Sequence, residues 1–268
     1  MTLPRFPRCV ITGAGSGFGR ALAIDLASRG AHLVLSDRDV EGVEETARLA
    51  RGAGAATARA TKCDVTRRED VEALADACPA TTDLIVNNAG VSSAGLVGEL
   101  SIDDWRWTLE TNLLGVVHGC HVFVPRLRAQ GYGHVLNVAS AAAFVAPPGM
   151  AAYNVAKAGV VALSETLAAE FVGTRVGVTV LCPTFFRTNL ARSGRFSSEG
   201  DRARALRLVD GGKEPGFVVR AALTSVANDE LYCLPMADAR WLWRLKRLVP
   251  QRYPALVAKV SRRVLGES

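Results

Sequence analysis

Short apolar segments alternate with longer helix-like segments along most of this 268-residue chain. Strands are predicted at residues 8–12, 32–36, 56–62, 84–86, 134–140 and 176–181. Helices are predicted at residues 20–29, 40–50, 68–77, 103–128 and 156–171. Strands that alternate with helices of about ten residues or more form βαβ units, in which helices cover both faces of a parallel sheet. The pattern therefore predicts the α/β class, as one doubly wound Rossmann-type domain with a mostly parallel sheet.

The positive charge of the chain is concentrated at its C-terminal end. Residues 240–268 contain eight Lys and Arg residues and one acid, Glu267, so this tail carries +7 while the whole chain carries +6. Residues 1–239 therefore carry −1, and a nearly neutral body argues against a nucleic-acid partner. Because residues 1–239 contain no internal repeat and no linker, we expect one domain there, followed by a basic tail at 240–268.

The six cysteines are scattered, without a CxxC spacing and without a cluster of histidines beside them. This is typical of buried thiols in a reducing compartment, and it favours neither disulfides nor a metal site. A strand-like run begins at residue 8, which leaves no room for a signal peptide. No apolar run reaches the ~18–20 residues of a membrane span. We therefore expect a cytoplasmic protein without a metal.

Polar and glycine-rich residues follow the ends of the predicted strands. They are the glycine-rich turn at 13–19, Asp37, Asp64, the run Asn87–Gly90, Ser140 and Pro183. The carboxyl ends of parallel strands meet at one edge of the sheet, and open α/β sheets bind their ligands there. We therefore expect these residues to line a single crevice.

The glycine-rich turn joins the first predicted strand to the first predicted helix. Its glycines are Gly13, Gly17 and Gly19, with Ser16 and Phe18 between them. Such a turn lets a pair of phosphates approach the backbone and presents them to a helix N-terminus. The spacing is not the strict GxGxxG fingerprint, and no P-loop lysine follows. A merely flexible turn is the alternative.

Asp37 ends the second predicted strand, where a carboxylate can accept hydrogen bonds from an adenosine ribose. The same carboxylate would repel a 2′-phosphate, and Ser16 brings no positive charge, so the pair favours NAD(H) over NADP(H). Arg38, which could bind a phosphate, leaves NADP(H) open. A solvated turn residue is the alternative for Asp37.

Tyr153 and Lys157 are four residues apart, a spacing that places two side chains on the same face of a helix. A nearby ammonium favours the phenolate, so we expect Lys157 to lower the Tyr153 pKa towards the range of an acid/base catalyst. Alone, such a pair is typical of a helix surface.

The motifs together resemble those of the short-chain dehydrogenase/reductase family. The segments that carry the resemblance are Thr12–Gly19, Asn87–Gly90, Asn112, Ser140 and Tyr153-xxx-Lys157, which occur in that family's order and approximate spacing. Residues 8–235 are similar to its shorter-chain branch. The resemblance implies a sheet of seven strands, a nicotinamide cofactor and oxidoreductase activity on alcohols.

The resemblance also implies a role for each matching residue. Tyr153 would be the general acid/base, Lys157 would lower its pKa and bind the nicotinamide ribose, and Ser140 would hold the substrate oxygen. Asn112 would support a proton-relay water near Lys157. The cofactor cleft would be lined by Asn88, Ala89 and Gly90, by Asp64 and Val65 at the adenine, and by Pro183 and Thr188 at the carboxamide. Residues 188–216 would form an irregular substrate lid.

The basic tail has two apolar stripes with helical spacing. Trp241, Leu245 and Leu248 form the first stripe; Leu256, Val257, Val260 and Val264 form the second, opposed by Lys259, Arg262 and Arg263. Such helices could rest on an anionic membrane surface, pack on a partner subunit, or be ordinary packed helices with a solvated basic face. A hydrophobic tail near the site would suit a lipophilic small-molecule substrate.

Three hypotheses for the function follow. The leading one is an NAD(H)-dependent oxidoreductase that interconverts a secondary alcohol and a ketone on a steroid-, retinoid- or fatty-type substrate. The second is an NADPH-dependent ketoreductase of acyl chains, against which Asp37 argues. The third is a non-catalytic dinucleotide sensor or scaffold, against which the intact catalytic set argues. By resemblance we expect a homodimer or homotetramer, formed through the helices that begin near Asp103 and Ala156.

Overall fold

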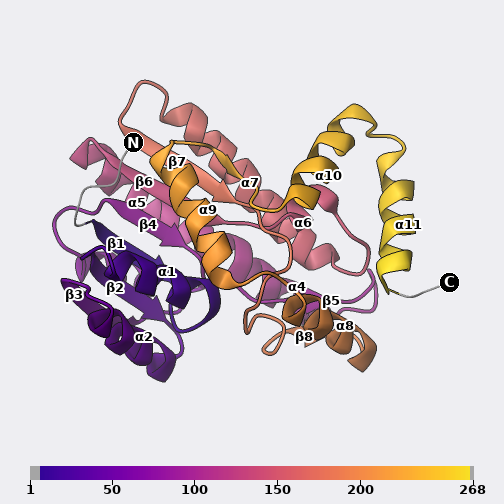
Figure 1. The fold of residues 1–268 in the computed structure, drawn as a ribbon, viewed down its shortest axis with the longest axis horizontal. Coiled ribbons are helices and arrows are strands. Elements are labelled where there is room, and N and C mark those ends of the chain that lie inside the picture. The colour runs from indigo at the N-terminus through magenta and orange to yellow at the C-terminus, as the bar shows by residue number, and fades with distance from the viewer. Residues whose placement is uncertain (1–6, 266–268) are drawn as a thin grey trace.

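The computed structural model describes the backbone of residues 7–265 and the side chains of residues 7–261. A parallel seven-stranded sheet forms its centre, in the order β3-β2-β1-β4-β6-β7-β9 (Figure 1). The strands are β1 (Arg8–Thr12), β2 (His32–Asp37), β3 (Thr57–Lys62), β4 (Leu84–Asn87), β6 (Gly133–Val138), β7 (Val176–Leu181) and β9 (Tyr232–Cys233). The α/β class and the seven strands are thus confirmed. The two-residue β9 was not among the predicted strands.

Helices cover both faces of the sheet because successive strand residues point to opposite sides. On one face, Cys9 and Ile11 pack with α1 (Gly17–Ala27), α2 (Val40–Gly52) and α9 (Pro215–Ala227). On the other face, Val10 packs with α3 (Arg68–Asp76), α5 (Gly115–Gln130) and α7 (Ala151–Glu170). The sheet is therefore buried on both sides, and its carboxyl edge is left for a ligand.

Two predicted helices differ from the observed ones. The predicted helix at 103–128 is divided into α4 (Ile102–Leu109), a π-helical turn η1 (Glu110–Leu114) and α5. The helix predicted to begin at residue 156 begins at Ala151, because the prolines that seemed to prolong the loop end at Pro148 and Ala is a strong helix former. Tyr153 therefore lies inside the first turn of α7.

The substrate-side segment at 188–216 is more regular than predicted. It contains β8 (Arg195–Phe196), which pairs with β5 (Ser93–Ala94), and helix α8 (Glu199–Asp210). Ser198 caps α8 by accepting a hydrogen bond from the Asp201 backbone N–H. This capping residue was obscured by the many polar side chains around it, and the prediction of an irregular segment is wrong.

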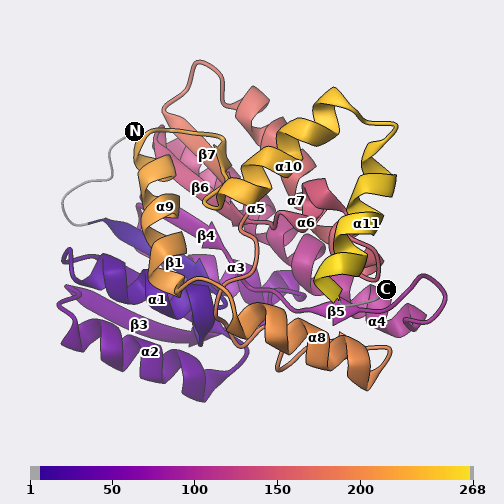
Figure 2. The same cartoon turned by 45° about the vertical axis from the view of Figure 1, so that its right-hand side comes forward.

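The tail forms two helices, α10 (Ala237–Leu248) and α11 (Tyr253–Leu265). Figures 1 and 2 show them as a V-shaped pair beside the short helix α6 (Ala142–Val145), far from β2 and β3. The Trp243 ring lies 6.0 Å from the Phe144 ring and 5.4 Å from the Tyr232 ring, centroid to centroid. The tail thus packs directly on α6. The predicted positions Val264, Arg262 and Arg263 lie outside the described side chains.

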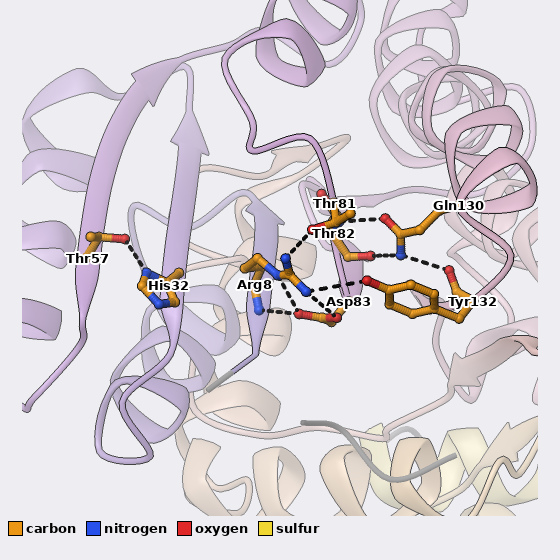
Figure 3. Close-up of polar contacts among 8 residues, drawn as sticks. All are labelled: Arg8, His32, Thr57, Thr81, Thr82, Asp83, Gln130 and Tyr132. Atoms are coloured by element: carbon orange, nitrogen blue, oxygen red, sulfur yellow. Dashed lines mark hydrogen bonds and ion pairs between the residues drawn. The ribbon is translucent and has the colours of Figure 1, made fainter. Parts of the chain in front are cut away.

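A polar network joins the amino ends of three strands, at the edge opposite to the predicted crevice (Figure 3). Arg8 and the buried Asp83 form an ion pair of 3.1 Å, and Arg8 also contacts the Tyr132 hydroxyl at 3.4 Å. Gln130 bonds the backbone N–H and C=O of Thr82 at 2.9 Å each. These contacts fix the start of β1, β4 and β6 relative to one another.

The six cysteines are free thiols, and all but Cys78 are buried. Within the part of the chain that is described, no group of His, Cys, Asp and Glu could hold a metal ion. Among the same residues, no helix is long and apolar enough to cross a membrane.

Candidate active site

The glycine-rich turn lies between β1 and the start of α1. Gly13 and Gly17 have φ angles of +64° and +54°, which side chains rarely adopt. A Cβ at Gly13 would lie 2.6 Å from the Ala89 Cα, and a Cβ at Gly19 would lie 2.4 Å from the Gly13 carbonyl oxygen. The turn therefore needs its glycines for conformation and packing, and it leads directly into the N-terminus of α1, where no side chain caps the helix.

Asn88 connects this turn to the end of β4. Its side-chain amide donates to the carbonyl oxygens of Thr12 and Gly13, both at 2.9 Å, and its backbone N–H donates to the Thr12 hydroxyl at 3.0 Å. Ala89 donates to the same hydroxyl at 3.2 Å. The Thr12 hydroxyl donates in turn to the Val86 carbonyl at 3.3 Å. Asn88 and Thr12 thus hold the phosphate-side turn against the sheet.

Asp37 lies at the edge of the glycine turn, half-buried at the end of β2. One carboxylate oxygen accepts from the Gly15 backbone N–H at 2.9 Å, and the other accepts from the Asp39 N–H at 3.0 Å. Arg38 is exposed beside it. The negative charge therefore lies where the second strand meets the turn, as the sequence predicts.

Asp64 and Val65 follow β3 and serve the local structure. One Asp64 carboxylate oxygen accepts from the Thr66 N–H at 3.0 Å and the Thr66 hydroxyl at 2.8 Å. Val65 is buried against Gly115, where a Cβ would lie 2.7 Å from a Val65 methyl group. The Val65 carbonyl also lies 2.8 Å from the Nδ1 of His118. These contacts bring the end of β3 beside the start of α5.

Tyr153 and Lys157 lie one helical turn apart on α7, and both are less than a tenth exposed. The Lys157 ammonium lies 5.8 Å from the Tyr153 ring centroid and donates to the Val138 carbonyl at 2.8 Å. Ser140 lies just past the end of β6, close enough to Tyr153 for its hydroxyl to lower the Tyr153 pKa. Three groups that can handle protons thus converge at one point.

Burial shifts the pKa of both Tyr153 and Lys157. It raises the pKa of Tyr153 to about 12, partly offset by the Ser140 hydrogen bond. It lowers the pKa of Lys157 to about 8. The Tyr153 shift is opposite to the prediction, because desolvation outweighs the ammonium, which donates to Val138 instead. In the protein without cofactor or substrate, the Tyr153 side chain is therefore a neutral phenol.

Asn112 lies in the π-helical turn and is fully buried. Its side chain accepts from the Val91 N–H at 2.7 Å and donates to the Val91 carbonyl at 2.8 Å. A Cβ at Gly90 would lie 3.1 Å from the Asn112 oxygen and 3.7 Å from the Lys157 nitrogen. Gly90 therefore lies between Asn112 and Lys157, where a larger side chain would crowd the Asn112 oxygen. π-Bulges are frequent at functional sites.

The segment after β7 closes the crevice on its other side. The Pro183 carbonyl accepts from the Ala141 N–H at 2.9 Å and from the Ser140 hydroxyl at 3.5 Å. Further on, the Thr188 Cβ would lie 3.4 Å from a Cβ at Gly17. The segment thus connects the Ser140 loop with the glycine turn.

The structure brings every site residue predicted from the sequence to the carboxyl edge of the sheet. It adds a buried chain of hydrogen bonds that the sequence analysis missed. Asn87 donates to Asn137 at 2.8 Å, and Asn137 donates to the Ser164 hydroxyl at 3.0 Å. Two asparagines inside otherwise apolar strands are the signal that could have revealed it. The chain braces β4, β6 and α7 beneath the Tyr153 site.

The arrangement fits a dinucleotide. The free N–H groups of α1 suit a pyrophosphate, the Asp37 carboxylate suits a ribose, and Lys157 and Tyr153 lie at the far end of the same edge. The glycines at the turn let the phosphates of a dinucleotide approach the protein backbone closely. The site therefore has the chemistry for hydride transfer next to a proton donor.

Comparisons with known proteins agree with this geometry. The family model for short chain dehydrogenase matches residues 8–197. The putative oxidoreductase SadH of Mycobacterium tuberculosis is 35% identical over 257 residues, covering 93% of each chain. D-threitol dehydrogenase of Mycolicibacterium smegmatis is 38% identical over 200 residues, covering 74% of this chain and 76% of the relative.

A solved structure is also similar along nearly the whole length. It is that of a short chain dehydrogenase/reductase from Burkholderia phymatum in complex with NAD, with a TM-score of 0.87 and 35% identity. The match covers 92% of this chain and 94% of that one.

Proposed function

Because this chain belongs to the short-chain dehydrogenase family, whose members are oxidoreductases that bind NAD(P), we propose that it interconverts a secondary alcohol and a ketone with NAD(H). The observation that supports the proposal is that Ser140, Tyr153 and Lys157 lie together at the carboxyl edge of the sheet, with Tyr153 and Lys157 buried. Hydride transfer makes or consumes an alkoxide, so the reaction needs a donor and a tunable acid at that oxygen.

The proposed mechanism assigns one task to each of these residues. Tyr153 exchanges a proton with the substrate oxygen, and Ser140 donates a hydrogen bond to the same oxygen. Lys157 holds a nicotinamide ribose and contributes positive charge that favours the phenolate. Bound NAD(H) supplies or accepts the hydride. Asn112 keeps the π-helical turn and Val91 in place beside Lys157, which is consistent with the support of a relay water.

The Asp37 carboxylate supports NAD(H) as the cofactor. Its two hydrogen bonds to backbone N–H groups hold the carboxylate in a fixed position at the edge of the turn. A 2′-phosphate placed there would meet like charge. The exposed Arg38 favours NADP(H), and an NADPH-dependent acyl ketoreductase is the alternative that it supports.

Three segments around Ser140 and Tyr153 support a lipophilic substrate. They are residues 90–97, 141–150 and 183–186, and none of them contains a charged side chain. Phe185 is 42% exposed, and Leu96 and Val97 are more than half exposed. The asparagine Asn154 donates to the Pro147 carbonyl at 2.9 Å and thereby holds the middle segment on α7. D-threitol, the substrate named for one relative, is a small polyol, so polar alcohols belong in the test.

We also propose that the protein is a homodimer or homotetramer through the α4–α5 and α7 helices. Leu114 is 44% exposed and Val155 is 50% exposed, so each long helix presents an apolar side chain outward. Burial of such residues stabilises homo-oligomers.

The test is a screen of steroid, retinoid-type, long-chain and small polar secondary alcohols with NAD and with NADP. Turnover is measured as the change in nicotinamide absorbance. We expect the fastest turnover with NAD and a lipophilic alcohol, and a loss of about a hundredfold or more in kcat for Tyr153→Phe. Tyr132→Phe is the matched control, because its hydroxyl lies in the network at the opposite edge. Turnover that survives in Tyr153→Phe would exclude the mechanism, and no turnover with any alcohol would favour the scaffold hypothesis.

A further inference from the structure

Helix α10 has two apolar faces, and only one of them is covered. Ala239 is buried on the inner face, and Trp243 packs against Phe144 and Tyr232. On the outer face, Trp241 is 60% exposed and Leu248 is 78% exposed. An exposed Trp and Leu on one stripe is unusual for a solvated helix surface.

The inner contacts hold α10 firmly, so the outer face has a fixed orientation. The Arg247 guanidinium lies 4.0 Å above the Trp243 ring, and Arg240 donates to the Leu234 carbonyl at 2.8 Å. The Tyr232 hydroxyl, next to this stack, donates to Glu165 on α7. In the predicted stripe, Trp241 and Leu248 therefore point away from the protein, and Leu245 between them is partly exposed.

Helix α11 also has exposed apolar side chains. Tyr253 and Val257 are buried on its inner side, whereas Leu256 is 41% exposed and Val260 is 45% exposed. We call Trp241, Leu245, Leu248, Leu256 and Val260, from the two helices, the tail face.

Basic side chains alternate with the apolar ones along both tail helices. Arg244, Arg252 and Lys259 are exposed, as are Arg240 and Arg247, whose guanidinium groups contact Leu234 and Trp243. Asp238 is the acid in the first turn of α10, and residues 240–268 carry +7. Apolar side chains, a tryptophan and a basic rim are the features with which amphipathic helices lie in the headgroup region of anionic bilayers.

We propose that the tail face docks on an anionic membrane surface. A bilayer interface accepts the Trp241 indole and the leucines, while Arg244, Arg252 and Lys259 reach the lipid phosphates. A second copy of the chain is a poorer occupant, because two tails of +7 each would meet in a symmetric contact. This docking does not require catalysis. Taken with the proposed function, on which this step rests, it makes the membrane the source of the substrate alcohol.

The docked tail would lie next to the substrate side of the site. Helix α6, on which Trp243 packs, begins two residues after Ser140. Docking would therefore hold α6, and with it the uncharged segment 141–150, near the bilayer surface.

Co-sedimentation of the full chain with vesicles tests the docking. We expect binding to phosphatidylcholine vesicles that contain about a third phosphatidylglycerol, and little binding to pure phosphatidylcholine. Raising the salt to about 0.5 M should weaken the binding, because the charges on the rim are screened. The double variant Trp241→Ser, Leu248→Ser should lose at least about tenfold in partitioning.

Matched controls separate this proposal from folding and from activity. Val172→Ser removes an apolar side chain that is 81% exposed but lies outside the tail, and it should bind vesicles like the wild type. The variant Arg244→Gln, Lys259→Gln keeps the apolar stripe and should lose selectivity for the anionic lipid. Tyr153→Phe should bind normally, so a failed catalytic proposal and a failed docking proposal give different results.

Two outcomes would overturn the proposal. One is a wild-type chain that ignores anionic vesicles. The other is a double variant whose vesicle binding is unchanged while its oligomeric mass falls, which would make the tail face a contact between copies.

Discussion

The Asp37 carboxylate accepts two backbone hydrogen bonds at the edge of the glycine turn, so its charge lies at a fixed place. Asp37→Asn removes the charge and keeps the shape. We expect the ratio of kcat/KM for NAD over NADP to fall about tenfold or more, because the repulsion of a 2′-phosphate is lost and Arg38 remains. The measurement is the initial rate with each cofactor.

Glu41→Gln is the control for this change, since Glu41 is an exposed acid in the first turn of α2. It should leave the cofactor ratio unchanged. A wild-type ratio in Asp37→Asn would show that Asp37 does not select the cofactor.

The positions of single residues were more predictable than their electrostatics. The positions of Ser140, Tyr153 and Lys157 follow from helical spacing and from the ends of strands, which a sequence shows. The raised pKa of Tyr153 follows from burial, which depends on how the surrounding segments pack. A local pattern cannot supply that quantity.

At the scale of elements, Arg195 holds the substrate-side segment on α4. Its guanidinium lies 3.0 Å from an Asp104 oxygen and 4.2 Å from the Trp107 ring centroid. Arg195→Gln should raise the KM for the alcohol severalfold and speed proteolysis within residues 188–216, because β8 loses this support. The free energy of unfolding should change by about 1 kcal/mol or less, as for other surface ion pairs.

Arg106→Gln is the matched control, because Arg106 pairs with Asp103 at 3.2 Å entirely within α4. It should not alter the proteolysis pattern. If both variants behaved alike, β8 would be held by its strand pairing with β5 alone.

Elements with a strong apolar period were predicted well, and the exceptions have local causes. The strands at 8–12 and 176–181 have the predicted bounds. β8 and β9 contain only two residues each, too few to give a periodic pattern. The π-helical turn was missed because a single inserted residue leaves the composition of a helix unchanged, and its cause, Asn112 bound to Val91, is a tertiary contact.

At the scale of the whole molecule, the two edges of the sheet differ in what they contribute. The candidate site lies at the carboxyl edge, whereas the Arg8 network and His134 lie at the amino edge. The His134 ring is fully buried, and its Nε2 lies 2.8 Å from the Thr179 hydroxyl. That hydroxyl donates to the Glu230 carbonyl, so it accepts from the ring and leaves Nδ1 unprotonated, 3.7 Å from Asp229.

Burial lowers the pKa of His134 to about 4, against the attraction of Asp229. Above a pH of about 6.5 the imidazole is neutral in the folded and the unfolded chain, so it adds no pH dependence. As the pH falls from 6.5 to 4, only the unfolded chain takes up the proton, so stability is lost. The total loss from this group is about 3 kcal/mol.

Chemical denaturation at several pH values would measure this loss. His134→Gln should be less stable at pH 7, because the bond to Thr179 changes, but its stability should decline less between pH 6.5 and 4. His32→Gln, which alters a histidine bonded to Thr57 on the same edge, is the control and should keep the wild-type decline. An unchanged decline in His134→Gln would assign the acid sensitivity to other groups.

The π-helical turn at 110–114 also makes the length of this part of the chain matter. A straight α-helix needs one residue fewer there, and each residue rotates a helix by about 100°. Deletion of a single residue from the turn would let α4 and α5 merge without disturbing the sheet, but it would rotate Asn112 away from Val91 and Lys157. The chain therefore contains one residue more than a regular helix would need here. The position of Asn112 beside Val91 and Lys157 depends on that extra residue.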